Sequence, residues 1–93
     1  MTKTIETEME VSEDLVSKLI QTNDELLKGH GLNVIVRDNR NCASRTDIYQ
    51  FKECVVYLSI DIPTGITHCT YSHVDNININ ERHGQFLETV RGL

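Results

Sequence analysis

The sequence has no Trp, one Pro and two Phe among 93 residues, so its core must be built mainly from Ile, Leu and Val. A chain of this length forms one domain, which we assign to residues 1–93. A small aliphatic core leaves a thin margin of stability. Because an interface between two copies would bury further apolar area, we expect a homodimer.

Long apolar runs are also missing, and no segment approaches the ~20 residues that span a membrane. Glu6, Glu8 and Glu10 occupy the place where a signal peptide needs an apolar segment. Three cysteines, an odd number, fit free thiols in a reducing compartment better than a disulfide framework. These features predict a cytoplasmic protein without membrane contact.

Basic residues are scarce at the N-terminal end. Residues 1–25 carry seven acids against two bases, whereas residues 26–93 carry seven of each, so the whole net charge of −5 lies in the first 25 residues. This asymmetry disfavours direct binding to nucleic acid, which depends on Lys and Arg, and favours a basic protein as partner. The acids of this segment form our predicted partner-binding set: Glu6, Glu8, Glu10, Glu13, Asp14, Asp24 and Glu25.

The apolar pattern predicts an α+β fold in the order β-α-β-β-β-β-α, an antiparallel sheet of four to five strands with two helices on one face. Residues 5–11 alternate apolar and acidic, as in a half-buried strand. Ser12 is the expected N-cap of one helix over residues 13–28, which Gly29 ends. Asn78, with Glu81 three residues later, resembles a capping box that starts the last helix.

Four strands are expected between the helices. Residues 32–37 place Leu32, Val34 and Val36 on one side, and residues 47–52 place Tyr49 and Phe51 on one side, with a possible bulge near residue 52. Residues 54–62 and 66–74 pair across a three-residue loop, residues 63–65, if Ile62 faces Ile66.

That register aligns Tyr57 with Tyr71 and places Val55 and Cys69 on the same face. The sheet face away from the helices then carries Val55, Tyr57, Cys69 and Tyr71, which we predict as a possible dimer or partner surface. Mid-helix Gly84 suggests a close packing contact in the last helix.

Signals for catalysis and cofactors are weak. The His and Cys residues of segment 67–73 have no zinc-like spacing, and strand geometry separates them, so we expect no metal and no cofactor. Cys42 lies between Arg40 and Arg45, which would favour its thiolate, but no base or oxyanion site can be assigned to it. The same arginines, with Arg37, would suit a phosphate or carboxylate, although Asp38 and Asp47 stand beside them as pairing partners.

At the level of class, the acidic segment Glu6-Thr7-Glu8-Met9-Glu10 with Glu13-Asp14 resembles the small phage-type proteins that mimic DNA, such as anti-restriction inhibitors. The resemblance implies a non-catalytic inhibitor that occupies the groove of a nuclease or nucleic-acid-binding protein in a bacterial cytoplasm. We therefore predict a non-catalytic acidic interaction module. The alternatives are a small structural or assembly protein using its exposed sheet face and a Cys42-dependent enzyme.

Overall fold

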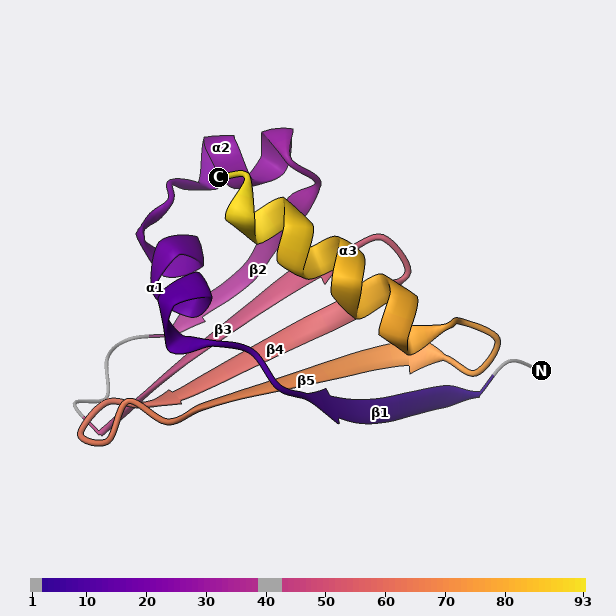
Figure 1. The fold of residues 1–93 in the computed structure, drawn as a ribbon, viewed down its shortest axis with the longest axis horizontal. Helices are drawn as coiled ribbons and strands as arrows, with labels where there is room; N and C mark the ends of the chain where they lie inside the picture. The colour runs from indigo at the N-terminus through magenta and orange to yellow at the C-terminus, as the bar shows by residue number, and fades with distance from the viewer. Residues whose placement is uncertain (1–2, 39–42) are drawn as a thin grey trace.

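The computed structural model describes residues 3–38 and 43–93 and confirms the α+β fold class. In chain order its elements are β1 (Thr4–Met9), α1 (Glu13–Gln21), α2 (Asp24–Gly29), β2 (Leu32–Asp38), β3 (Ser44–Phe51), β4 (Cys54–Asp61), β5 (Thr67–Val74) and α3 (Ile79–Arg91). The strands form one antiparallel sheet in the order β1-β5-β4-β3-β2, with β1 and β2 at its edges (Figure 1).

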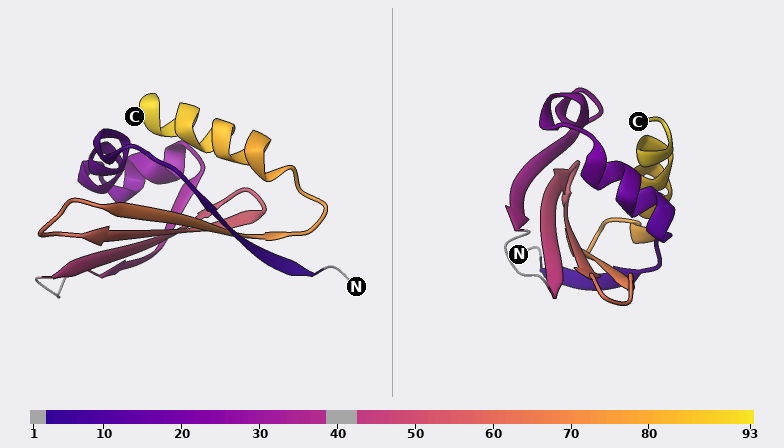
Figure 2. Two further views of the ribbon diagram at one scale, coloured as in Figure 1. Left: turned by 60° about the horizontal axis from the view of Figure 1, so that its bottom comes forward. Right: turned by 90° about the vertical axis from the view of Figure 1, so that its left-hand side faces the viewer.

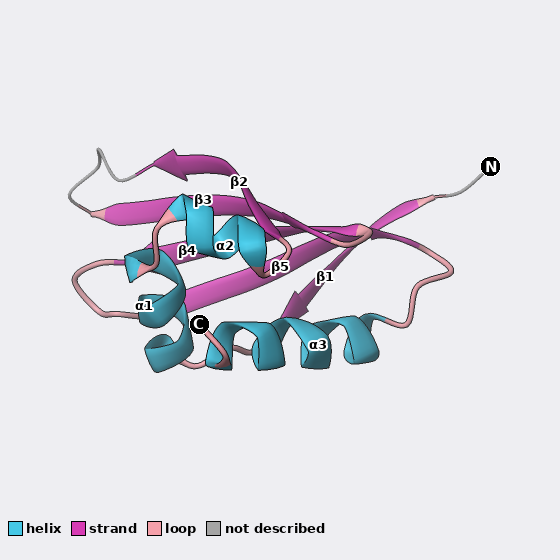
Figure 3. Ribbon diagram, turned by 90° about the horizontal axis from the view of Figure 1, so that it is seen from above, coloured by secondary structure: helices cyan, strands magenta, loops and turns pink. Residues whose placement is uncertain are grey.

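All three helices lie on one face of the sheet, and the opposite face is covered by none of them (Figure 2). Seen from above, α3 runs along the β1–β5 side, while α1 and α2 lie toward β2 and β3 (Figure 3). The core fills the space between the layers, where Phe86 of α3 packs edge-on against Phe51 and Tyr71 at ring distances of 5.6 and 5.8 Å. The buried apolar set is Val16, Leu19, Leu27, Leu32, Tyr49, Phe51, Cys54, Val56, Leu58, Cys69, Tyr71, Phe86 and Val90.

The prediction of a single helix over residues 13–28 is wrong, because the chain forms two helices separated at Thr22 and Asn23. Asn23 is the N-cap of α2, and its side chain accepts a hydrogen bond from the Leu26 N–H at 2.9 Å. Arg37 of β2 donates to the carbonyls of Ile20 and Thr22 at 2.9 and 3.2 Å, which satisfies the end of α1. The sequence pattern did not indicate this break, because the helical spacing of apolar residues continues from α1 into α2.

The register of the β4–β5 hairpin differs by one residue from the expected one. Asp61 pairs with Ile66 across a four-residue loop, and its carbonyl accepts the Gly65 N–H at 2.7 Å. Gly65 has a φ of 75°, which favours glycine. The loop therefore consists of residues 62–65, and Ile66 pairs with Asp61 instead of Ile62.

This shift divides the surface predicted from Val55, Tyr57, Cys69 and Tyr71. Side chains alternate along a strand, so a slip of one residue moves a whole strand's set to the other face. Val56 pairs with Tyr71 and Leu58 with Cys69, and all four are buried under the helices. Only Val55 and Tyr57 remain on the uncovered face, so Cys69 and Tyr71 are core residues.

Two further details of the strands were not expected. A β-bulge between Val34 and Val36 sends Leu32 and Val34 toward the helices, whereas Val36 pairs with Ile48 on the uncovered face. Lys52 and Glu53 form a two-residue turn, with Lys52 at φ 54°, instead of a bulge in a continuous strand. Tyr49 and Phe51 share the buried face, as predicted.

The elements at the two ends agree best with the sequence pattern. Thr7 and Met9 of β1 face inward, while Glu6 and Glu8 face solvent. The Asn78 side chain accepts from the Glu81 N–H at 3.2 Å and starts α3, and Gly92 ends it. Gly84 has no neighbour within 4 Å of the place where a Cβ would stand, so the close packing contact suggested for it is absent.

Candidate functional site

The uncovered face of the sheet, which we call the open face, has an apolar centre. The strand registers align Val36, Ile48, Tyr57, Thr70 and Glu8 in one row across all five strands. Directly opposed side chains in such a row stand about 4.5–5.5 Å apart. Tyr57 is 37 % exposed and Val36 39 % exposed, although both are large apolar side chains at the middle and one end of the row.

A second row lies beside the first. It contains Asn33, Gln50, Val55, Ser72 and Glu6, from β2 to β1. Val55 therefore extends the apolar centre, and polar side chains surround it. An apolar centre within a polar rim is the usual composition of a surface that binds another protein.

The charges of the open face are all acidic among the residues that the structure describes. Glu6 and Glu8 stand at the β1 edge, Asp38 at the β2 edge and Asp61 at the end of β4. No Lys or Arg of the described strands points to this face. His68, which can carry a positive charge, does so, and its Nδ1 lies 3.1 Å from Glu8 Oε1. The face thus presents an apolar centre between carboxylates.

The seven acids predicted to bind a partner do not share one surface. Glu6 and Glu8 belong to the open face, whereas Glu10 lies in the linker after β1. The other four occupy the first turns of the two N-terminal helices: Glu13, Asp14, Asp24 and Glu25. There their negative charges interact favourably with the partial positive charge at the N-terminal end of each helix.

Two of these helix acids also have structural neighbours. The carboxylate of Glu13 lies against Gly65 in the β4–β5 loop, where a Cβ would meet its Oε1. Asp24 forms an ion pair with Arg37, whose Nε lies 3.1 Å from Asp24 Oδ1, although Nε lacks hydrogen-bond geometry. Both acids therefore contribute to the fold.

The arginines proposed to hold an anion are largely engaged within the fold. Arg37 contacts Asp24 and two carbonyls, and Arg45 Nε lies 3.3 and 3.2 Å from the two carboxylate oxygens of Asp47. The sequence correctly indicated Asp47 as a partner. Arg40 and Cys42 lie outside the described residues, so the Cys42 hypothesis stays a prediction.

A chain of polar contacts between β5, α3 and the linker after β1 was not foreseen. His83 Nε2 lies 2.9 Å from the Glu10 carbonyl, which can only accept, so Nε2 carries the proton. In neutral His83, Nδ1 then accepts the hydroxyl proton of Tyr71 at 2.8 Å. This chain fixes the linker after β1 to α3, and only tertiary pairing brings these three residues together.

Cys69 adjoins this chain. The residue is 1 % exposed and lies in the buried core beside Tyr71. Burial raises the pKa of the Cys69 thiol to about 12. Cys69 is therefore protonated at neutral pH, which does not suit a nucleophile.

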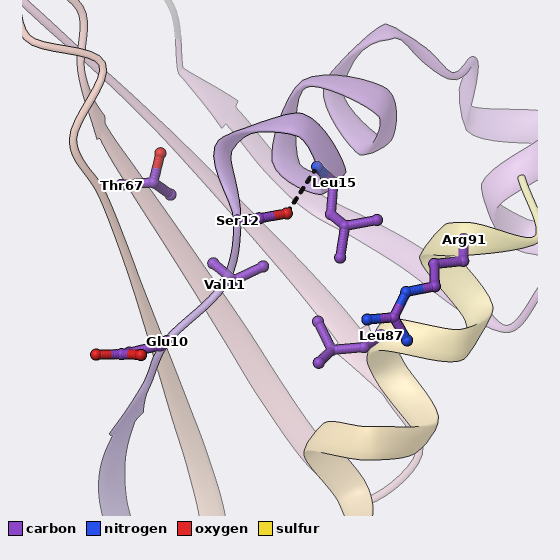
Figure 4. Close-up of a pocket in the computed structure, with 7 residues that line it drawn as sticks. All are labelled: Glu10, Val11, Ser12, Leu15, Thr67, Leu87 and Arg91. Carbon is purple, nitrogen blue, oxygen red and sulfur yellow. Dashed lines mark hydrogen bonds between the residues drawn. The ribbon is translucent and has the colours of Figure 1, made fainter.

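A cleft opens on the helix side of the molecule, where the β1–α1 linker passes between β5 and α3 (Figure 4). Its volume is about 420 Å³. Val11, Leu15 and Leu87 form its apolar walls, and its polar lining consists of Glu10, Ser12, Thr67 and Arg91.

Within residues 3–38 and 43–93, no group of three or more His, Cys, Asp or Glu is placed to hold a metal ion. The described helices are all too short and too polar to cross a membrane. Comparisons with protein-family models, with curated proteins and with solved structures found no match to this chain.

Proposed function

We propose that this chain is a non-catalytic interaction module that binds a basic protein surface through its open face. One observation carries the proposal: the described part of this face combines an exposed apolar centre with four carboxylates and no Lys or Arg. A partner with Lys or Arg around an apolar contact would complement it in both charge and polarity.

The two parts of the face would contribute differently. Tyr57 and Val36 offer apolar area at the centre, where aromatic side chains commonly carry much of the binding energy. Glu6 and Glu8 stand at the rim, where charges mainly speed association and make it depend on salt. Exposed charges are screened over about 8–10 Å at 0.1–0.15 M ionic strength, so binding should weaken as salt is added.

The sharper form of the proposal is competition with nucleic acid. Glu6 and Glu8 stand two residues apart on one strand, about 6.6–6.8 Å along it. Such carboxylates, with Asp61 and Asp38 across the sheet, would occupy a basic groove that otherwise holds phosphates. This form requires the captured partner to lose DNA or RNA when the chain binds.

The test is a pull-down from bacterial lysate at low salt with the tagged chain, followed by elution in a rising salt gradient. We expect basic proteins to elute as salt rises and to be recovered poorly by the Glu6→Gln/Glu8→Gln variant. The matched control, Glu25→Gln/Glu88→Gln, removes the same charge from the helices. Equal loss with both variants would show that only net charge matters and would contradict an open-face site.

A second function, self-assembly through the same face, is favoured by the exposure of Tyr57 and Val36. Pairing two open faces would, however, bring carboxylates together with no Lys or Arg to meet them. Sedimentation equilibrium separates the two functions. A structural protein is favoured over a basic-partner module if self-assembly strengthens with salt and if the Tyr57→Lys variant no longer self-assembles.

A further inference from the structure

We propose that the cleft on the helix side binds a small amphipathic carboxylate, a molecule with an aliphatic chain and one carboxylate group. The site lies on the helix side of the sheet, where the β1–α1 linker passes between β5 and α3, and is separate from the open face. The inference therefore does not rest on the proposed function. It rests on the lining of the cleft and on the state of Arg91.

Arg91 differs from the other described arginines because its guanidinium has no partner in the described residues. Arg37, Arg45 and Arg82 form ion pairs with Asp24, Asp47 and Glu53. The hydrogen bond that Arg91 makes with Lys18 uses its backbone carbonyl, which accepts from Lys18 Nζ at 2.8 Å, and not its side chain. The Arg91 side chain is therefore free to bind an anion, and its planar fork matches a carboxylate.

The surroundings of Arg91 select an anion with an apolar part. In Figure 4 the guanidinium extends from α3 toward Leu87 and the start of α1, where Leu15 and Val11 line the cleft. These three side chains are partly buried and pack against the core, so they form a fixed apolar wall. A volume of about 420 Å³ lies within the range of small-molecule sites, roughly 300–1,000 Å³.

Charge would orient the ligand within the cleft. Glu10 projects from the linker away from Arg91 (Figure 4), so it would repel a carboxylate from its own end. The carboxylate would therefore bind Arg91, with the aliphatic chain along Leu87, Leu15 and Val11.

The cleft is also held in shape by hydrogen bonds to the backbone carbonyls of two lining residues, Arg91 and Glu10. The Lys18 bond to the Arg91 carbonyl joins α1 to α3, and the His83 bond to the Glu10 carbonyl joins α3 to the linker. These contacts do not use the Arg91 guanidinium. Replacing that side chain should therefore leave the cleft intact.

The experiment is a titration of the uniformly ¹⁵N-labelled full chain with octanoate below its micelle concentration, followed by amide spectra. We expect saturable shifts at Val11, Ser12, Leu15, Leu87 and Arg91. The variant Arg91→Met should weaken binding about tenfold, the usual scale for one charge-assisted contact. Lys28→Met, which removes a charge from the exposed face of α2, should bind as the unmodified chain does.

Octylamine, which has the same chain length and the opposite charge, is the matched probe and should produce no saturable shifts in the cleft. The proposal is overturned if octanoate produces no saturable shifts, if its shifts lie outside the cleft, or if octylamine binds equally well. Unchanged octanoate affinity in Arg91→Met would overturn it too. The amide spectrum of unliganded Arg91→Met shows whether that variant is folded, and Arg91→Lys should retain part of the affinity.

Discussion

Replacing Asp47 with Ala should destabilise the fold by about 3 kcal/mol, the lower end of the range for breaking a buried ion pair. Asp47 is fully buried beneath the helices. Its carboxylate accepts from Arg45 Nε at 3.3 and 3.2 Å and from the Tyr49 hydroxyl at 3.2 Å. The substitution leaves both donors without this partner, and we choose the lower end because the Arg45 side chain is 20 % exposed.

The loss is large on the scale of the whole domain. Domains have unfolding free energies of about 0.05–0.15 kcal/mol per residue, or roughly 5–14 kcal/mol for a chain of this length. A loss of about 3 kcal/mol lowers the melting temperature by roughly 12–24 °C in a domain of this size. Urea unfolding followed by circular dichroism measures the change directly.

A second substitution tests the assigned cause. In the Asp47→Ala/Tyr49→Phe variant the orphaned hydroxyl is removed, so the double variant should be about 1 kcal/mol more stable than the sum of the single losses predicts. The explanation fails if Asp47→Ala costs less than about 1 kcal/mol, or if the two losses simply add.

Two more predictions concern the thiols and the glycines. Burial raises the pKa of the Cys69 thiol to about 12, from 9.0 for a free thiol. Between these two pH values the folded state keeps the thiol proton and the unfolded state loses it. The unfolding free energy should therefore fall as pH rises from about 9 to 12. In urea titrations, Cys69→Ala should reduce the decrease in unfolding free energy between pH 8 and 10.5 by about 1–2 kcal/mol. An unchanged pH dependence of the unfolding free energy would refute the assignment. Gly84→Ala, in open space on α3, should stabilise by about 0.5–1 kcal/mol, whereas Gly65→Ala, at φ 75° against Glu13, should destabilise by about 1–2 kcal/mol. Thermal unfolding of the two glycine variants side by side checks the opposite signs.

Local signals in the sequence predicted the elements well. Period-two alternation located β1, and the side chains of Ser12 and Asn78 cap α1 and α3 as expected. These features depend on residues within one turn or one strand. The break at Asn23 escaped because the apolar spacing continues across it, and Arg37, which satisfies the carbonyls there, comes from another element.

The candidate site depended on pairing between strands, which the sequence specifies weakly. A loop one residue longer than expected moved Cys69 and Tyr71 into the core, and a bulge before Val36 brought that residue to the open face beside Ile48. Both changes follow from side-chain alternation, in which one residue reverses a face. Tyr57 and Glu8 are both exposed, but their common row became visible only with the register.

The most direct test of the central proposal compares three forms of the tagged chain in the low-salt pull-down: unmodified, Glu6→Gln/Glu8→Gln, and Glu25→Gln/Glu88→Gln. The open-face proposal predicts that basic proteins bind the first and third forms and elute from both at similar salt, whereas the second form recovers little. It is contradicted if the second form retains them as well as the third does.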